Sequence, residues 1–214
     1  MAPPALTAGR PRAGAGEAPG HDGSTPGGGS GRLGREAQLK HSELVGLIRR
    51  GVPAPGGIWA DLGSGEGAFT SALAELVGAS AMIFSVDKDR SALARQQKAG
   101  GSRFAQAPTS VMLADFQEPL ELPPLDGVVM ANSLHFVIDK AAVLAMVHGY
   151  LKPGGRLIVV EYDVDRGNHW VPHPFSFETW KSMAVASGFT EPELIGRHPS
   201  RWLDGLYSAV STRQ

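Results

Sequence analysis

The fold of this protein is decided by residues 58–69, which read IWADLGSGEGAF. The first five of these residues are apolar apart from Asp61, which predicts a short buried strand. Three glycines follow at positions 63, 65 and 67, and glycine lets a backbone turn sharply. Apolar residues then recur at helical spacing at Phe69, Ala72, Leu73, Leu76 and Val77. The stretch therefore predicts a strand, a glycine turn and a helix in immediate succession.

The same alternation of strand and helix continues along the chain. Further strands are predicted at Ala81–Val86, Val111–Leu113, Gly127–Ala131 and Leu157–Val160, with two weaker ones at Leu194–Ile195 and Leu206–Val210. Helices are predicted around Leu44–Ile48, at Ser91–Gln97, after an Asp139 cap, and at Phe177–Ser187 after a Ser176 cap. Such alternation indicates an α/β fold, a doubly wound parallel sheet with helices on both faces.

Composition excludes several classes of protein. The 214 residues fit a single domain, and the absence of cysteine rules out a disulfide framework, a cysteine-ligated metal site and a thiolate nucleophile. The net charge of −1 gives no general attraction to nucleic acid or to an anionic membrane. No apolar run approaches the roughly 20 residues of a membrane span, and the first residues lack the apolar core of a secretory signal, so we expect neither. We therefore expect a cytoplasmic protein without nucleic-acid partners.

The first 34 residues differ from the rest of the chain. They contain 10 Gly, 5 Pro and 6 Ala, and almost no large apolar side chain that a core would bury. This composition predicts a disordered tail over residues 1–34, followed by one folded domain over residues 35–214.

Four polar residues stand at or just beyond the ends of predicted strands: Asp61, Asp87, Asp115 and Asn132. Parallel sheets bind ligands at the carboxyl ends of their strands, so these side chains predict a binding site. Asp87 follows the last glycine of the turn by 20 residues, the position of a carboxylate that accepts hydrogen bonds from ribose hydroxyls. A nicotinamide dinucleotide and an adenosine-containing methyl donor would both use this carboxylate.

Asp61 favours one of these two ligands. A carboxylate so close to the glycine turn would repel a pyrophosphate, but it would attract the ammonium and sulfonium charges of S-adenosylmethionine. Asp115 would accept a hydrogen bond from the amino group of adenine, while the backbone N–H of Phe116 donates to the ring. A nicotinamide-dependent oxidoreductase stays open as an alternative, and so does a non-catalytic scaffold that keeps the same fold.

These motifs occur in the order found in the class I S-adenosylmethionine-dependent methyltransferases, which the chain resembles from about Arg35 onward. The matching segments are Asp61–Gly67 for the cofactor loop, Asp87 for the ribose acid, Ala114–Phe116 for the adenine contact, Leu125–Val129 for the fourth strand and Leu151–Gly155 for the turn before the fifth. The resemblance implies a seven-stranded sheet whose last strand is antiparallel. Within the family, the chain is similar to the small-molecule branch of quinone-biosynthesis-type methyltransferases.

The resemblance also implies which residues hold S-adenosylmethionine. They are Asp61, Gly63, Ser64, Gly65, Gly67, Asp87, Lys88, Asp115, Phe116 and Asn132. Lys88 stands where many family members have an apolar residue, so its aliphatic stem would have to cover the adenine ring. The acceptor implied is a small organic molecule.

His135 is the candidate catalytic residue, because it follows the fourth strand at the edge where the methyl group would be exposed. Its ordinary pKa of about 6.5 suits a general base. Glu161 and Tyr162, at the end of the fifth strand, are candidate acceptor contacts, and residues 163–175 are the candidate acceptor wall. His169 and His173 have the spacing of helical metal ligands, but Pro172 lies between them and no third ligand is evident, so no metal is predicted.

Residues 132–135 read NSLH and lack the run by which base-amino methyltransferases hold a flipped nucleobase. The helix-rich insertions that usually cap a small acceptor are also missing. The acceptor site is therefore either open or closed by a second subunit, so a homodimer is one expectation.

Overall fold

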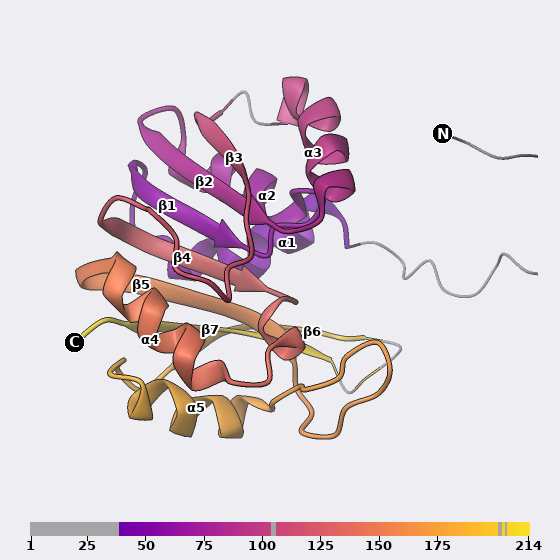
Figure 1. Cartoon of the computed structure of the whole chain (residues 1–214), viewed down its shortest axis with the longest axis vertical. Coiled ribbons are helices and arrows are strands. Elements are labelled where there is room, and N and C mark those ends of the chain that lie inside the picture. Colours follow the sequence, from indigo (N-terminus) through magenta and orange to yellow (C-terminus); the bar gives the residue numbers. More distant parts are fainter. Residues whose placement is uncertain (1–38, 104–105, 201–202, 204) are drawn as a thin grey trace, which may run out of the picture. The chain divides into compact units, whose positions relative to one another are not determined.

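The computed structural model describes residues 39–103, 106–200, 203 and 205–214, and for residues 100–103 it describes the backbone alone. The predicted tail of residues 1–34 lies outside the described residues, so both the tail and the domain boundary at residue 35 stay predictions. The described part is built around one seven-stranded sheet (Figure 1).

The strands lie in the order β3-β2-β1-β4-β5-β7-β6. Their bounds are β1 Gly57–Leu62, β2 Ala81–Asp87, β3 Thr109–Leu113, β4 Leu125–Ala131, β5 Leu151–Tyr162, β6 Glu193–His198 and β7 Leu206–Thr212. The first five strands pair in parallel, and β7 is antiparallel to both of its neighbours. This confirms the predicted doubly wound sheet with an antiparallel last strand.

Helices cover both faces of the sheet (Figure 1). The α-helices are α1 His41–Ile48, α2 Ala68–Val77, α3 Arg90–Arg103, α4 Lys140–Tyr150 and α5 Phe177–Ala186, and the short 3₁₀ turns are η1 Arg49–Gly51 and η2 Leu134–Phe136. Side chains along β1 alternate between the two faces, as a strand requires. Trp59 packs on the side of α1 and α2, whereas Ala60 and Leu62 pack on the side of α4 and α5.

Both predicted helix caps are confirmed. The Asp139 side chain accepts a hydrogen bond from the Ala142 backbone N–H at 3.1 Å, and Ser176 accepts one from the Thr179 N–H at 3.2 Å. Each cap satisfies one of the backbone donors that a helix N-terminus leaves free. The caps begin α4 and α5, which lie on the same face of the sheet.

Two predicted boundaries are wrong. Helix α3 does not end before Gly100 but continues to Arg103. The predicted turn at Lys152–Gly155 lies inside β5, where the pairing with β4 jumps from Leu151 to Arg156. A left-handed Gly154, with φ of 77°, lies in this irregular stretch, so the extra residues bulge out of the ladder and strand pairing then resumes.

No helix in the described ranges is both long enough and apolar enough to cross a membrane.

Candidate functional site

The glycine turn between β1 and α2 is held against the end of β2. The backbone N–H groups of Gly63 and Ser64 both donate to the Val86 carbonyl, at 2.8 and 3.0 Å, and the Gly67 N–H donates to the Ser64 carbonyl at 2.9 Å. Gly63 and Gly67 both have φ of 80°, a left-handed conformation that side chains with a Cβ disfavour. The turn is therefore a rigid backbone feature that the glycines make possible.

The three glycines of the turn have different surroundings. A Cβ on Gly63 would lie 2.4 Å from the Cβ of Ser133, and one on Gly67 would lie 2.6 Å from Cγ of Gln96. A Cβ on Gly65, in contrast, would have no heavy atom of the described neighbours within 4 Å. Gly63 and Gly67 thus face protein, whereas Gly65 faces open space that a ligand can enter.

Asp87, at the end of β2, reaches the same open face. Its Oδ2 accepts a hydrogen bond from the Gly65 N–H at 2.7 Å, and its Oδ1 accepts one from the Asp89 N–H at 2.8 Å. A carboxylate oxygen has two lone pairs, so each oxygen keeps acceptor capacity for a ligand hydroxyl. The structure thus brings together the glycine turn and the acid predicted to bind ribose.

The predicted adenine contacts lie just after the ends of β2 and β3. They are Lys88, Asp115 and Phe116. The Lys88 ammonium is 3.0 Å from Oδ2 of Asp115, and Oδ1 accepts from the Gln117 N–H at 3.0 Å. Burial alone would raise the pKa of Asp115, but the Gln117 N–H and the Lys88 ammonium together hold it below its ordinary value. Phe116 packs its ring against the turn, since its Cε1 would be 3.2 Å from a Cβ on Gly63.

Asp61 lies beneath the turn rather than at its open face. The side chain is 1% exposed, and the Thr70 hydroxyl donates to its Oδ2 at 2.6 Å. Ser85 and Gln96 extend this polar cluster, with the Gln96 amide donating to Ser85 Oγ at 2.6 Å. Desolvation raises the pKa of Asp61 to about 7, despite the opposing Thr70 hydrogen bonds. Asp61 therefore changes charge near neutral pH.

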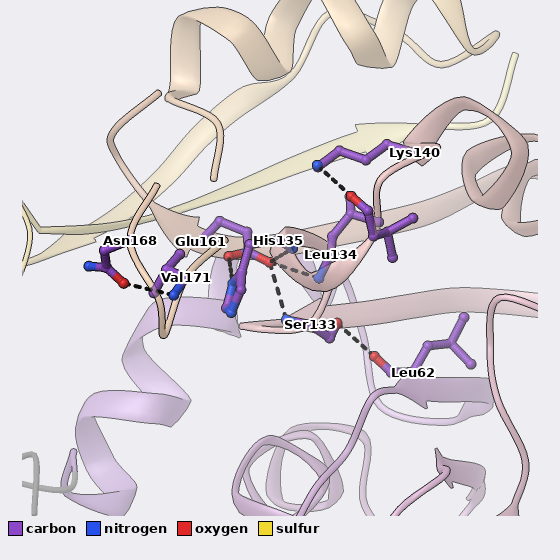
Figure 2. A network of polar contacts seen from close by, with 9 residues as sticks. Leu62, Ser133, Leu134, His135, Lys140, Glu161, Asn168 and Val171 are labelled. Atoms are coloured by element: carbon purple, nitrogen blue, oxygen red, sulfur yellow. Dashed lines mark hydrogen bonds and ion pairs between the residues drawn. The ribbon is translucent and has the colours of Figure 1, made fainter. Parts of the chain in front are cut away.

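The turn after β4 is hydrogen-bonded to the start of the glycine turn. Asn132 has a φ of 51°, which is uncommon for a residue other than glycine, and its backbone N–H donates to the Val160 carbonyl at 2.8 Å. The Ser133 hydroxyl donates to the carbonyl of Leu62 at 2.9 Å, directly before Gly63 (Figure 2). The ends of β1 and β4 are thus fixed to each other. The sequence pattern did not single out Ser133.

His135 and Glu161 form a buried pair next to this turn. His135 Nδ1 lies 2.7 Å from Glu161 Oε2, and the two side chains are 3% and 0% exposed. The other carboxylate oxygen accepts from the backbone N–H groups of residues 133–135 (Figure 2). Sequence reasoning nominated both residues separately, but it did not predict that they contact each other.

Residues 163–175, the predicted acceptor wall, begin where β5 ends and contact the His135 turn. The backbone N–H of His173 donates to the His135 carbonyl at 3.0 Å. Asn168 caps a tight turn by accepting from the N–H groups of Trp170 and Val171, which leaves the Trp170 side chain 76% exposed. Within the described ranges, no group of three or more His, Asp and Glu side chains is placed to hold a metal.

Residues 60–159 match the family model described as a methyltransferase domain. The chain is 31% identical over 109 residues to the ubiquinone/menaquinone biosynthesis C-methyltransferase of Marinomonas sp. (strain MWYL1), which covers 48% of the chain and 41% of that protein. Both matches support the resemblance to the class I S-adenosylmethionine-dependent methyltransferases.

Other similar proteins carry different acceptors in their names. An arsenite methyltransferase of Aquipseudomonas alcaligenes is 28% identical over 158 residues, which cover 65% of the chain and 46% of that protein. The chain spans less than half the length of these curated relatives. Its fold matches that of the Burkholderia thailandensis 1,6-didemethyltoxoflavin-N1-methyltransferase with a TM-score of 0.65 at 19% identity, over 84% of the chain and 80% of that structure.

The turns after β1 and β4 have features that fit S-adenosylmethionine. Among the described residues, seven buried side-chain polar atoms make no hydrogen bond within the protein, and two of them, Ser64 Oγ and Asn132 Oδ1, belong to these turns. Buried polar atoms are normally paired, so the Ser64 hydroxyl is suited to accept from or donate to a bound ligand, and the Asn132 amide oxygen is suited to accept from one. They lie in the turns after β1 and β4, on either side of the Ser133 contact, where the sequence resemblance predicts the cofactor.

Proposed function

We propose that this protein transfers the methyl group of S-adenosylmethionine to a small organic acceptor. The observation that carries the proposal is the open face at Gly65, where the Asp87 carboxylate accepts a hydrogen bond from the Gly65 backbone N–H and a Cβ on Gly65 would meet no described neighbour within 4 Å. The cofactor residues would be those predicted from the sequence: Asp87 for ribose, Asp115 and Phe116 for adenine, and the turns at residues 63–67 and 132 for the methionine portion. Lys88 would flank the adenine, with its ammonium held by Asp115.

Several observations limit the acceptor. The names of similar proteins mention ubiquinone/menaquinone biosynthesis, arsenite and 1,6-didemethyltoxoflavin, and these compounds are all small molecules. The chain has no cysteine, which argues against arsenic chemistry that depends on a protein thiolate. A cytoplasmic location, the lack of a nucleic-acid partner and a homodimer that closes the acceptor site all remain part of the proposal. His135 is the candidate general base.

Calorimetric titration of the purified protein with S-adenosylmethionine, S-adenosylhomocysteine and NADH tests the proposal before any acceptor is known. We expect micromolar binding of the first two and none of NADH. Binding of NADH alone would support the nicotinamide-dependent oxidoreductase instead. If the first two bind but no acceptor in a broad metabolite pool gives S-adenosylhomocysteine, the scaffold alternative gains support.

The affinity for S-adenosylmethionine should rise by about tenfold between pH 6 and pH 8, because Asp61 is mostly protonated at the lower pH and mostly ionised at the higher one. The ionised carboxylate attracts the positively charged ligand, so binding releases a proton. Titrations at several pH values measure this dependence. Asp61→Asn should bind more weakly at pH 8 and lose the pH dependence, and an unchanged profile in that variant would show that Asp61 is not responsible.

The same raised pKa affects folding stability. Asp61 holds its proton more tightly in the folded state than in the unfolded chain, so its contribution to stability is fully present below pH 4 and falls as the pH rises to about 7. Thermal melts over this range should therefore show a steeper loss for the natural protein than for Asp61→Asn. If both proteins lose stability equally steeply with rising pH, groups other than Asp61 cause the loss.

A further inference from the structure

Glu161 is a fully buried carboxylate at the end of β5, and its two oxygens have separate roles. Oε1 accepts hydrogen bonds from the backbone N–H groups of Ser133, Leu134 and His135, at 3.2, 2.9 and 3.2 Å. Oε2 faces Nδ1 of the His135 ring at 2.7 Å (Figure 2). One side chain thus holds both the backbone of the turn after β4 and the ring that the turn carries.

This arrangement selects one form of the imidazole. An ionised carboxylate can only accept hydrogen bonds, so Nδ1 must carry the hydrogen that points at Oε2. In a neutral ring, Nε2 then has the free lone pair. A histidine held in this way presents Nε2 as a base, and the carboxylate stabilises the imidazolium that forms when the ring takes up a proton.

The surroundings of the pair are largely apolar. The Phe136 ring lies with its centroid 4.2 Å from that of His135, and the Tyr162 ring lies at 6.0 Å. Lys140 is the cation whose field reaches Glu161, but its ammonium is bonded to the Val137 carbonyl at 2.8 Å. Burial lowers the pKa of Lys140, against the attraction of Glu161. In such a poorly hydrated site, a charge-assisted pair is stronger than it is in water.

We propose that Glu161 is a positioning residue that makes His135 a general base, and that the reacting group of the acceptor is a hydroxyl. This inference rests on the proposed methyl transfer. As the O–CH₃ bond forms and the C–S bond breaks, the hydroxyl O–H bond breaks and its proton moves to His135 Nε2. The positive charge of the sulfonium is thereby replaced by that of the imidazolium. The product is a methyl ether or enol ether.

A hydroxyl is the acceptor group whose methylation depends most on a positioned general base. A neutral amine already has a nucleophilic lone pair and can lose its proton after the methyl has been transferred. A phenol or enol with a pKa above neutral is a weak nucleophile until a base withdraws its proton. The base must also be aligned with the methyl donor, which explains why Glu161 fixes the turn backbone as well as the ring.

Nitrogen-15 NMR of the His135 ring tests the positioning role without an acceptor. We expect the natural protein to show a protonated Nδ1 and a bare Nε2. In Glu161→Gln, the Gln oxygen can still accept from the turn N–H groups, while its NH₂ group faces Nδ1 and should reverse the tautomer. A bare Nδ1 in the natural protein would overturn the inference. Glu178→Gln, on the exposed face of α5, is the matched control and should change nothing at His135.

Methyl transfer to phenol and to the more acidic 4-nitrophenol tests the acceptor class. Glu161→Gln and His135→Gln should each reduce kcat for phenol by about 100-fold or more, and reduce it far less for 4-nitrophenol, which is ionised without help. His135→Gln provides the same test if Glu161→Gln does not fold.

Equal losses for the two phenols, or no ether from either one, would overturn the hydroxyl assignment. Calorimetry separates this failure from that of the proposed function. If the natural protein binds S-adenosylmethionine and forms S-adenosylhomocysteine with another acceptor, only the assignment of Glu161 and the hydroxyl is wrong. If it does not bind, the proposed function itself fails.

Discussion

Gly65→Ala should lose at least about tenfold in affinity for S-adenosylmethionine and S-adenosylhomocysteine while the protein stays folded. The added Cβ meets no described atom within 4 Å, so it projects into the space that the cofactor would occupy. The φ of 55° costs an alanine roughly 1–2 kcal/mol of stability. Calorimetric titration and a thermal melt of the same sample measure the two effects separately.

Gly63→Ala should behave in the opposite way. Its Cβ would lie 2.4 Å from that of Ser133, inside the protein, and its φ of 80° adds backbone strain. Strain and overpacking together should lower the free energy of unfolding by roughly 2–5 kcal/mol. Two alanines only two residues apart would therefore separate a binding defect from a folding defect.

Gly154→Ala serves as the control for backbone strain alone. Gly154 has a φ of 77°, and a Cβ there would also have no described neighbour within 4 Å, but the residue lies in the bulge of β5. This variant should lose stability to an extent similar to Gly65→Ala and bind the cofactor normally. If Gly65→Ala also binds normally, the cofactor does not approach the turn at Gly65.

Asp87→Asn should weaken S-adenosylhomocysteine binding by roughly 10- to 100-fold. Hydrogen bonds to charged groups contribute about 1.5–3 kcal/mol each, and 1.4 kcal/mol corresponds to a factor of ten in affinity. Asparagine fits the same space, but its NH₂ group cannot accept from a ribose hydroxyl. Asp87 accepts from the N–H groups of both Gly65 and Asp89. The single side-chain oxygen of asparagine can keep only one of these two contacts.

The matched control for this prediction is Asp89→Asn, two residues further along. The Asp89 side chain caps the start of α3 by accepting from the N–H groups of Ser91 and Ala92, at 2.8 and 3.1 Å. Asparagine is also a good cap, so stability should change by less than about 1 kcal/mol and cofactor affinity should stay the same. Equal binding by Asp87→Asn and the natural protein would limit Asp87 to holding the turn.

The sequence was a reliable guide where the structure depends on local backbone chemistry. The glycine turn and the caps at Asp139 and Ser176 each have a signature within a few residues, and these predictions were confirmed. The boundary of α3 was not predictable in this way, because Gly100 lowers helix propensity without forbidding a helix. The bulge in β5 depends on its pairing with β4, which no local pattern reports.

The contacts within the candidate site are the least predictable part. Glu161 and His135 are 26 residues apart, and Ser133 and Leu62 are 71 residues apart, so their hydrogen bonds exist only once the sheet has formed. Burial changed the expected position of Asp61, because a carboxylate predicted beside the ligand lies beneath the turn on Thr70. The pH dependence of S-adenosylmethionine binding measures whether the charge of Asp61 still acts on the cofactor.

The position of β1 in the middle of the sheet has a consequence for synthesis of the chain. β1 pairs with β2 on one side and with β4 on the other, and β4 begins 63 residues after β1 ends. A growing chain that has reached only β3 therefore carries a strand with one row of backbone groups unpaired, and such an edge attracts other strands. When β4 emerges and docks beside β1, this row of backbone groups becomes paired, and the free edge passes to β4 until β5 pairs with it.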